Sequence, residues 1–328
     1  MSDNAPINAV NTRCLVMFSA SNSSVQRATL IGLFAPICWG MSVSLIRGIA
    51  EGFGLAQGQT LLYLVATICL FFTIGLPRFD RMDKRYLFIA IPTANLSSLS
   101  FCLAIFTSDG GAQTMEVGMV NYLWPSLTIL FAVLFNRVQT RWWLFPGLIV
   151  AFAGIVVILA GGNGFSIADF ILRFQHNPVS YLLGLSAAVT WAAFSSMTKA
   201  WGGNTNPSTF IFAIDTTIFG LLWLSGLAEG PTEIQMRGLL SVLFGGIAIG
   251  VAYAAWTHGM SKGNITILAA ASYFTPVLSC VFAMFWINAQ LDSSFWSGVA
   301  LVVIGSLLCW DATERGVKAK LKNNSHQE

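Results

Sequence analysis

Long apolar stretches without a charge dominate this chain and most limit what it can fold into. The segment GLIVAFAGIVVILAGG at 147–162 is one of them, and charged residues make up only 9% of the 328 residues. A soluble domain uses about 25% charged residues to cover its surface, so this chain is expected to be an integral membrane protein. Its net charge of +3 supplies no basic stripe to neutralise phosphates, which excludes nucleic acid as a partner.

Apolar windows bounded by charges or by Gly, Pro and Asn predict ten membrane-spanning helices. The continuous apolar runs favour helices over the alternating ten-residue segments of a membrane β-barrel. The predicted fold class is therefore all-α, with ten transmembrane helices. We expect the spans at 27–49, 59–77, 84–107, 112–135, 142–160, 179–199, 207–227, 236–258, 264–286 and 294–312.

The distribution of lysine and arginine predicts the orientation, because positively charged loops are retained in the cytoplasm. When alternate loops are assigned to opposite sides, only Arg47, Arg173 and Arg237 of the 17 basic residues fall on one side. Both termini are therefore expected to be cytoplasmic. The polar segment 1–26 forms an N-terminal tail in this prediction, and 314–328 forms a C-terminal tail.

The two halves of the chain repeat each other at an offset of 151 residues, with a weaker echo at 152 in the first and sixth spans. The matched pairs are Tyr122 with Tyr273, Pro125 with Pro276, Leu127 with Leu278, Phe131 with Phe282, Ala132 with Ala283, Gly147 with Gly298, Gly154 with Gly305 and, at 152, Trp39 with Trp191. The predicted units are five helices at 27–160 and five at 179–313, joined by a linker at 161–178. Because five is odd, the second unit enters the membrane from the opposite side, which makes an inverted repeat.

An inverted repeat favours a transporter, because it gives two conformations of similar energy that open to opposite sides. A channel needs no such symmetry, and an intramembrane enzyme seldom has it. These two classes remain the alternatives; the enzyme would act on lipid and would bring Glu116, Asp215 and His258 together. No metal cluster, nucleophile–base arrangement or phosphate-binding loop is recognisable, so we expect no metal and no cofactor.

Prolines near the middle of the fourth and ninth spans, Pro125 and Pro276, predict paired helix breaks. Each proline removes a backbone hydrogen bond, and the carbonyl that it frees needs a neighbouring helix or a wet cavity. Helical spacing puts two matching faces toward such a cavity. They are Gly118, Asn121, Tyr122 and Pro125, and Ala269, Ser272, Tyr273 and Pro276. Proline kinks that serve only helix packing are the alternative.

Six aromatic residues lie several positions inside their spans, where a ring with a polar tip suits a cavity better than lipid. They are Trp39, Tyr122, Trp191, Tyr253, Trp256 and Tyr273. A cleft lined by such rings favours a flat, largely apolar solute, oriented by hydrogen bonds from Asn95, Ser98 or Asn121. Ordinary packing within the bundle is the alternative for each ring.

Ionisable residues inside spans are costly and commonly mark function. Glu116 lies one turn into the fourth span and is a candidate site for a proton or for the amino group of a substrate, with an interfacial position as the alternative. Asp215, central in the seventh span, is interpreted as a structural hydrogen-bonding group. The six cysteines are interpreted as small core residues.

Three strings of the sequence resemble the YddG-type aromatic amino acid exporters, EamA-type members of the drug/metabolite transporter superfamily. They are EVGMVNYLWPSLTILF at 116–131, GVAYAAWTHGMSKGN at 250–264 and ASYFTPVLS at 271–279. The resemblance covers about 27–315. It implies ten helices with both termini in the cytoplasm, a bacterial inner-membrane location, and export of phenylalanine, tyrosine and tryptophan. Aromatic drugs such as methyl viologen belong to the same expectation.

We therefore expect a monomeric secondary transporter that works by alternating access and has membrane lipid and an aromatic small molecule as its partners. Its hinges are expected near Pro125 and Pro276. The residues expected to bind substrate are Trp39, Ser98, Tyr122, Trp124, Trp191, Tyr253, Trp256 and Tyr273. A carrier of the same fold for another drug or metabolite is the alternative.

Overall fold

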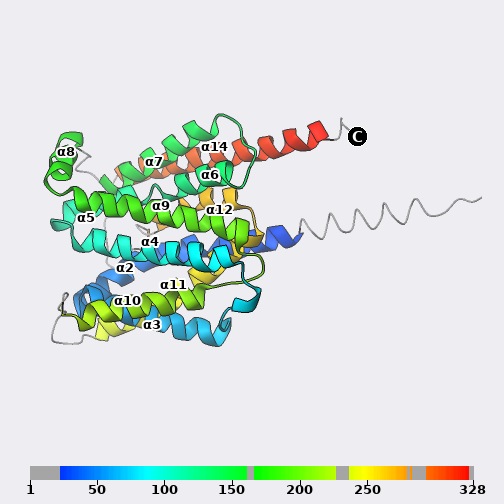
Figure 1. The fold of residues 1–328 in the computed structure, drawn as a ribbon. Helices are drawn as coiled ribbons and strands as arrows, with labels where there is room; N and C mark the ends of the chain where they lie inside the picture. The colour runs from blue at the N-terminus through cyan, green and yellow to red at the C-terminus, as the bar shows by residue number, and fades with distance from the viewer. Residues whose placement is uncertain (1–22, 161–165, 227–235, 279–280, 283–292, 325–328) are drawn as a thin grey trace, which may run out of the picture.

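The computed structural model describes residues 23–160, 166–226, 236–278, 281–282 and 293–324, and within these ranges it contains helices and no strand. Residues 23–32 are helical and lead through a turn at Leu33 into α2. The elements are α2 (Phe34–Phe53), α3 (Leu55–Thr73), η1 (Phe79–Arg81), η2 (Tyr86–Ala90), α4 (Ile91–Phe106), α5 (Gly110–Asn121), α6 (Trp124–Leu134), α7 (Leu144–Ala160), α8 (Ile167–His176), α9 (Pro178–Trp201), α10 (Ser208–Leu224), α11 (Met236–Lys262), α12 (Ile265–Ser272) and α14 (Ser293–Asn324). The long helices run side by side in Figure 1.

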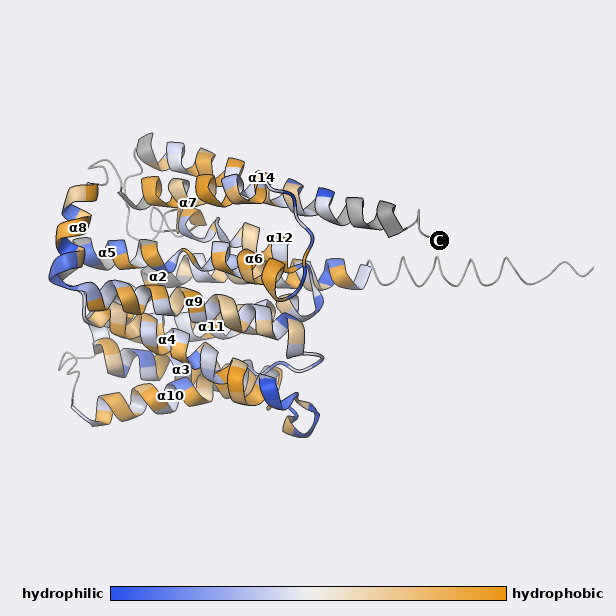
Figure 2. Cartoon of the chain, turned by 45° about the horizontal axis from the view of Figure 1, so that its top comes forward, coloured by the Kyte–Doolittle hydropathy of each residue, from blue (hydrophilic) through white to orange (hydrophobic). Residues whose placement is uncertain are grey.

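Five helices are long and apolar enough to cross a membrane, so the prediction of a helical membrane protein is confirmed. They span Leu55–Thr73, Tyr86–Phe106, Pro178–Trp201, Gly238–Lys262 and Phe295–Thr313, and shorter apolar helices lie at Trp124–Leu134, Leu144–Ile158 and Ser208–Leu224. Many large apolar side chains are exposed, and Phe72 and Leu224 are each 80% exposed. Figure 2 shows that hydrophobic residues recur along the helices of the bundle. In water such surface would be unfavourable, whereas in lipid it is the expected contact.

Two helices are interrupted at positions that match across the repeat. After α5 ends at Asn121, residues 122–123 form a turn before α6 begins at Trp124, and after α12 ends at Ser272, residues 273–274 form the same turn. The backbone resumes alike on both sides, because Leu127 N donates to Leu123 O at 3.0 Å and Leu278 N donates to Phe274 O at 2.9 Å. Each proline lies just beyond its turn, where the missing N–H leaves no hydrogen bond unmade.

Glycines form a close seam between α7 and α14. A Cβ on Gly154 would lie 2.7 Å from the backbone oxygen of Gly298, and a Cβ on Gly305 would lie 2.6 Å from the backbone oxygen of Gly147. The two helix backbones therefore touch at these points, as small residues permit between membrane helices. These contacts are crossed with respect to the sequence repeat. Gly147 matches Gly298 and Gly154 matches Gly305 in the repeat, but Gly154 touches Gly298 and Gly305 touches Gly147.

The remaining helices pack in matching pairs around a common core. The pair α2 and α11 has its counterpart in α9 and α4, while α3 packs against α10 and α6 against α12. Figure 1 places the first described residues and the end of α14 at the same end of the bundle. The connections between α3 and α4 and between α6 and α7 also lie there, as does the end of α9. These segments include Arg85, Arg141 and Lys199, so we call this the basic end, and we call the opposite end, which carries α8, the α8 end.

Several segments differ in detail from the sequence-based expectation. The segment 161–178 contains helix α8, whose apolar side chains include the exposed Ile167 and Leu172, and α14 continues beyond residue 313 to Asn324. Most of the expected tail 1–26, residues 161–165 of the linker, the end of the ninth span and residues 325–328 lie outside the described residues.

Candidate functional site

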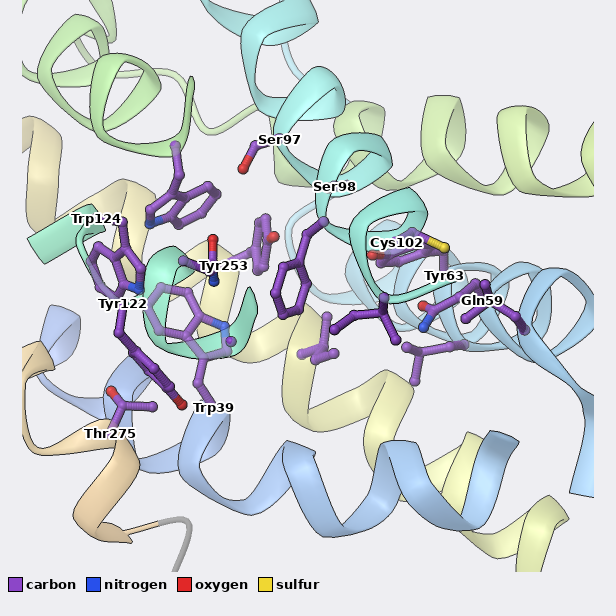
Figure 3. A pocket seen from close by; sticks show the side chains of 18 residues that line it. Trp39, Gln59, Tyr63, Ser97, Ser98, Cys102, Tyr122, Trp124, Tyr253 and Thr275 are labelled. Atoms are coloured by element: carbon purple, nitrogen blue, oxygen red, sulfur yellow. The ribbon is translucent and has the colours of Figure 1, made fainter. Parts of the chain in front are cut away.

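A cavity of about 270 Å³ lies at the centre of the bundle. Its volume is close to the lower limit of roughly 300 Å³ for small-molecule sites. Figure 3 shows that Trp39, Tyr122, Trp124 and Tyr253 gather at one end of it and Gln59, Tyr63 and Cys102 at the other. The lining comprises Trp39, Leu55, Gln59, Leu62, Tyr63, Ser97, Ser98, Phe101, Cys102, Ile105, Gly118, Asn121, Tyr122, Trp124, Trp191, Ile249, Tyr253 and Thr275.

Trp39 is the centre of the aromatic end. Its ring lies 5.8 Å from Trp124, 5.6 Å from Trp191, 5.8 Å from Tyr253 and 5.3 Å from Trp256, measured between ring centroids. Most of these pairs meet edge to face, the arrangement that aromatic quadrupoles favour. The five rings come from α2, α6, α9 and α11, so four helices that are distant in sequence converge on one aromatic cluster.

The aromatic cluster occupies the core on the side of the basic end, and the cavity extends away from it. Trp256 lies in the last third of α11, near Lys262, whereas the lining residues Leu55 and Gln59 are in the first turns of α3, at the α8 end. Ile105, near the end of α4, belongs to the same side. The cavity is therefore closed by tryptophans toward the basic end.

The polar groups of the lining are amides and hydroxyls. Gln59, Ser97, Ser98, Asn121 and Thr275 contribute them together with the three lining tyrosines, and the eighteen lining residues include no Lys, Arg, His, Asp or Glu. Hydrogen bonds from such groups orient a ligand without adding a net charge to the site. The cavity can therefore hold a ring by aromatic contact and orient a small polar head that carries no net charge.

The interruption between α5 and α6 explains why three neighbouring residues all reach the cavity. In a continuous helix Tyr122 and Trp124, which are two positions apart, would not face the same side. The turn at 122–123 rotates the following helix, so that all three line the same space. Thr275 follows the matching turn after α12 and lies opposite Tyr122 in Figure 3.

The residues expected to bind substrate fall into two groups. Trp39, Ser98, Tyr122, Trp124, Trp191 and Tyr253 line the cavity. Trp256 and Tyr273 are fully buried and lie outside the lining. Trp256 Nε1 donates to Ser195 Oγ at 3.0 Å, and the Tyr273 hydroxyl shares a hydrogen bond with Ser126. Trp256 still packs against Trp39, and the binding roles of all eight residues stay predictions.

Glu116 is paired away from the cavity lining. Arg173 of α8 reaches it through Nε, 3.0 Å from each carboxylate oxygen, and the Tyr181 hydroxyl donates to the same carboxylate. Glu116 is only 4% exposed, and its hydrogen bond raises the pKa of the Arg173 guanidinium above its ordinary value. The ion pair attaches α8 to α5 and α9. Its role as a proton or amino-group site stays a prediction.

Several lining residues were not predicted from the sequence. Tyr63 and Gln59 belong to α3 and Phe101 and Cys102 to α4, and none of them stands next to a proline or in a matched pair of the repeat. Tyr63 stacks on Phe212 with ring centroids 5.4 Å apart. The available signal was the polar Gln59 one turn before Tyr63 within an apolar helix.

Of the other residues singled out, Asn95 and Asp215 are hydrogen-bonded to each other beside the cavity, while His258 lies near the basic end of α11. They do not converge on one centre with Glu116. Within the described ranges no cluster of three His, Cys, Asp or Glu residues is placed to hold a metal ion.

Comparison with known proteins places this arrangement among transporters. The model of the EamA-like transporter family matches residues 178–310. The chain is 42% identical over 294 residues to the aromatic amino acid exporter YddG of Salmonella typhimurium, covering 88% of this chain and 99% of that protein. It is 41% identical over 296 residues to YddG of Escherichia coli, covering 89% and 99%. A solved crystal structure with 23% identity superposes with a TM-score of 0.72 over 89% of this chain, which shows the shared fold.

Proposed function

Because this chain belongs to the family of the YddG aromatic amino acid exporters, within the EamA-like transporters, we propose that it exports phenylalanine, tyrosine and tryptophan. The protein is a multi-pass membrane transporter with a small-molecule substrate. The observation that carries the proposed substrate class is the cavity, where Trp39, Trp191 and Tyr253 surround a space without a charged lining residue. Rings of this kind favour a flat aromatic substrate.

The polar lining suits the other end of an aromatic amino acid. A zwitterion needs acceptors for its ammonium group and donors for its carboxylate. Asn121 and Gln59 offer an amide oxygen and an amide N–H each, and Ser98 and Thr275 offer hydroxyls. The substrate ring would lie against the aromatic cluster, and its polar head would reach toward these groups.

Transport is proposed to proceed by alternating access between two inverted five-helix halves, at 27–160 and 179–313, in a fold of ten transmembrane helices. Two observations support it: the matching turns before Pro125 and Pro276, and the crossed glycine contacts of α7 and α14. Helices related by a two-fold axis in the membrane plane make contacts of this crossed kind. Pro125 and Pro276 lie beside the turns and are the proposed hinges.

The bacterial inner membrane is the proposed location, with both termini in the cytoplasm. The concentration of basic residues at the end of the bundle that carries both described chain ends supports this orientation. The cavity then opens toward the outside, and the aromatic cluster closes it toward the cytoplasm. The substrate would leave from this conformation. We propose that a single chain suffices for transport.

The test is counterflow in vesicles that contain the purified protein. Vesicles loaded with unlabelled phenylalanine should take up labelled phenylalanine transiently, and external tyrosine or tryptophan should compete with it, whereas leucine should compete weakly. A lack of counterflow with every aromatic amino acid would refute the proposed substrate class. Counterflow driven instead by an aromatic cation such as methyl viologen, with no competition from amino acids, would identify a drug carrier of the same fold.

A further inference from the structure

A carboxyl group is buried directly behind the cavity, in the middle of α10. Asp215 is fully buried, and Asn95 of α4 beside it is 5% exposed. Asn95 Nδ2 donates to Asp215 Oδ1 at 2.8 Å and to the carbonyl oxygen of Ile211 at 2.9 Å. Both hydrogens of the amide are therefore used, and one carboxyl oxygen is fixed in place.

The two remaining oxygens of this pair are buried without a hydrogen bond. They are Asp215 Oδ2 and Asn95 Oδ1. Buried acceptors without a partner are destabilising, and in native structures they call for an explanation. A proton on Oδ2 would convert one acceptor into a donor. A carboxylic acid and a primary amide are complementary, since each has one donor and one acceptor, and the N–H half of that pairing is present here.

No positive charge balances Asp215 among the described residues. The nearby groups that interact with its carboxyl, besides Asn95, are the side chains of Tyr63 from α3, Ser98 and Cys102 from α4, and Tyr253 from α11. None of these groups is a cation. Removal from water without a compensating cation favours the neutral, protonated form of a carboxyl, and ionisable groups at such depth commonly mark proton or ion pathways.

The same four side chains also line the cavity, which connects the carboxyl to the substrate site. Tyr63, Ser98, Cys102 and Tyr253 are all labelled in Figure 3 as lining residues, so groups that interact with Asp215 also border the space where the substrate would bind. An ammonium group in the cavity would stabilise the ionised carboxylate, whereas a bound proton stabilises the neutral one. The ammonium group of the substrate and the proton therefore favour opposite charge states of Asp215.

We propose that Asp215 is the proton-binding site of the transporter and that one proton is exchanged for one aromatic amino acid; this inference rests on the proposed function. In the outward-open form, a proton from external water binds Asp215 Oδ2 as the amino acid leaves. In the inward-open form, an amino acid enters with its ammonium group toward the carboxyl, and the proton returns to cytoplasmic water. Only the O–H bond on Asp215 forms and breaks, and one positive charge moves inward per amino acid exported.

The experiment uses vesicles of the purified full chain, with potassium and valinomycin to hold the membrane potential at zero and labelled phenylalanine at equal concentration on both sides. Acidifying the lumen by one pH unit should drive phenylalanine inward to about a tenfold concentration ratio, because one pH unit is a tenfold proton ratio. With no pH gradient imposed, phenylalanine added outside should make the lumen more alkaline, as reported by a trapped pH-sensitive dye. This second measurement needs no variant.

Asp215→Asn retains a polar side chain at the site but cannot bind or release the proton, so it should not accumulate phenylalanine in an acidic lumen, whatever rate of counterflow it retains. The matched control is Asp311→Asn, which removes a carboxylate that Trp143 and Arg315 hydrogen-bond on the opposite side of the molecule; it should accumulate phenylalanine normally. Accumulation by Asp215→Asn would overturn the proposal. Counterflow by the unmodified protein without any response to the pH gradient would also overturn it. So would a result in which Glu116→Gln loses accumulation while Asp215→Asn keeps it. The absence of counterflow in the unmodified protein would instead refute the proposed function.

Discussion

Replacing Trp39 by alanine should weaken substrate binding more than any conservative change at the same place. The Trp39 ring contacts four other rings at 5.3–5.8 Å and also faces the cavity. One aromatic pair contributes about 0.5–1.5 kcal/mol beyond its buried area. The loss of one ring contact with the substrate should therefore raise the half-saturation concentration for phenylalanine about 2- to 13-fold.

The same replacement removes four ring contacts within the protein, so the folded state should also lose roughly 2 kcal/mol or more. Trp39→Phe keeps a ring at the site and should stay within about threefold of the original affinity. The assay is counterflow at graded phenylalanine concentrations, with thermal unfolding in detergent measured in parallel. An unchanged half-saturation concentration in a folded Trp39→Ala protein would show that the substrate binds elsewhere.

Three further substitutions test contacts between helices elsewhere in the bundle. Gly154→Ala should lower the stability of the protein by about 1–3 kcal/mol, because the new methyl group would lie 2.7 Å from the backbone of Gly298. The control is Gly220→Ala, whose methyl group would meet only a side chain at 3.6 Å. Thermal unfolding should show this control to be neutral or stabilising by up to about 1 kcal/mol. Glu116→Gln should break the ion pair that joins Arg173 of α8 to α5, which would be seen as faster amide hydrogen exchange across α8. Exchange at the original rate would mean that other contacts hold α8 in place.

The sequence allowed prediction of those features that follow from local chemistry. The helix interruption near Pro125 was predictable because a proline within an apolar span cannot complete the backbone hydrogen bonds of a helix. The membrane class followed from the shortage of charge, and the comparisons confirm the family that the string at 116–131 suggested. The aromatic residues inside spans were informative because an aromatic ring with a polar tip is rarely placed in lipid without a reason.

The sequence did not allow prediction of which of two equivalent rings faces the cavity. Tyr122 and Tyr273 match across the repeat, yet Tyr122 lines the cavity and Tyr273 is fully buried against Ser126. A repeat seen in sequence is symmetric, whereas one conformation of a transporter opens to one side and packs its two halves differently. Tyr63 was missed because a single tyrosine in an apolar helix has no periodic or paired signal that distinguishes the cavity from a neighbouring helix.

The crossed contacts between α7 and α14 restrict how the gene can change. Gly154 lies against Gly298 and Gly147 against Gly305, so a larger residue in one half of the chain meets backbone contributed by the other half. A larger side chain at one of these glycines can therefore be accommodated only if the other half changes as well. If the halves descend from one duplicated ancestral segment, these four codons are where the copies should have diverged least.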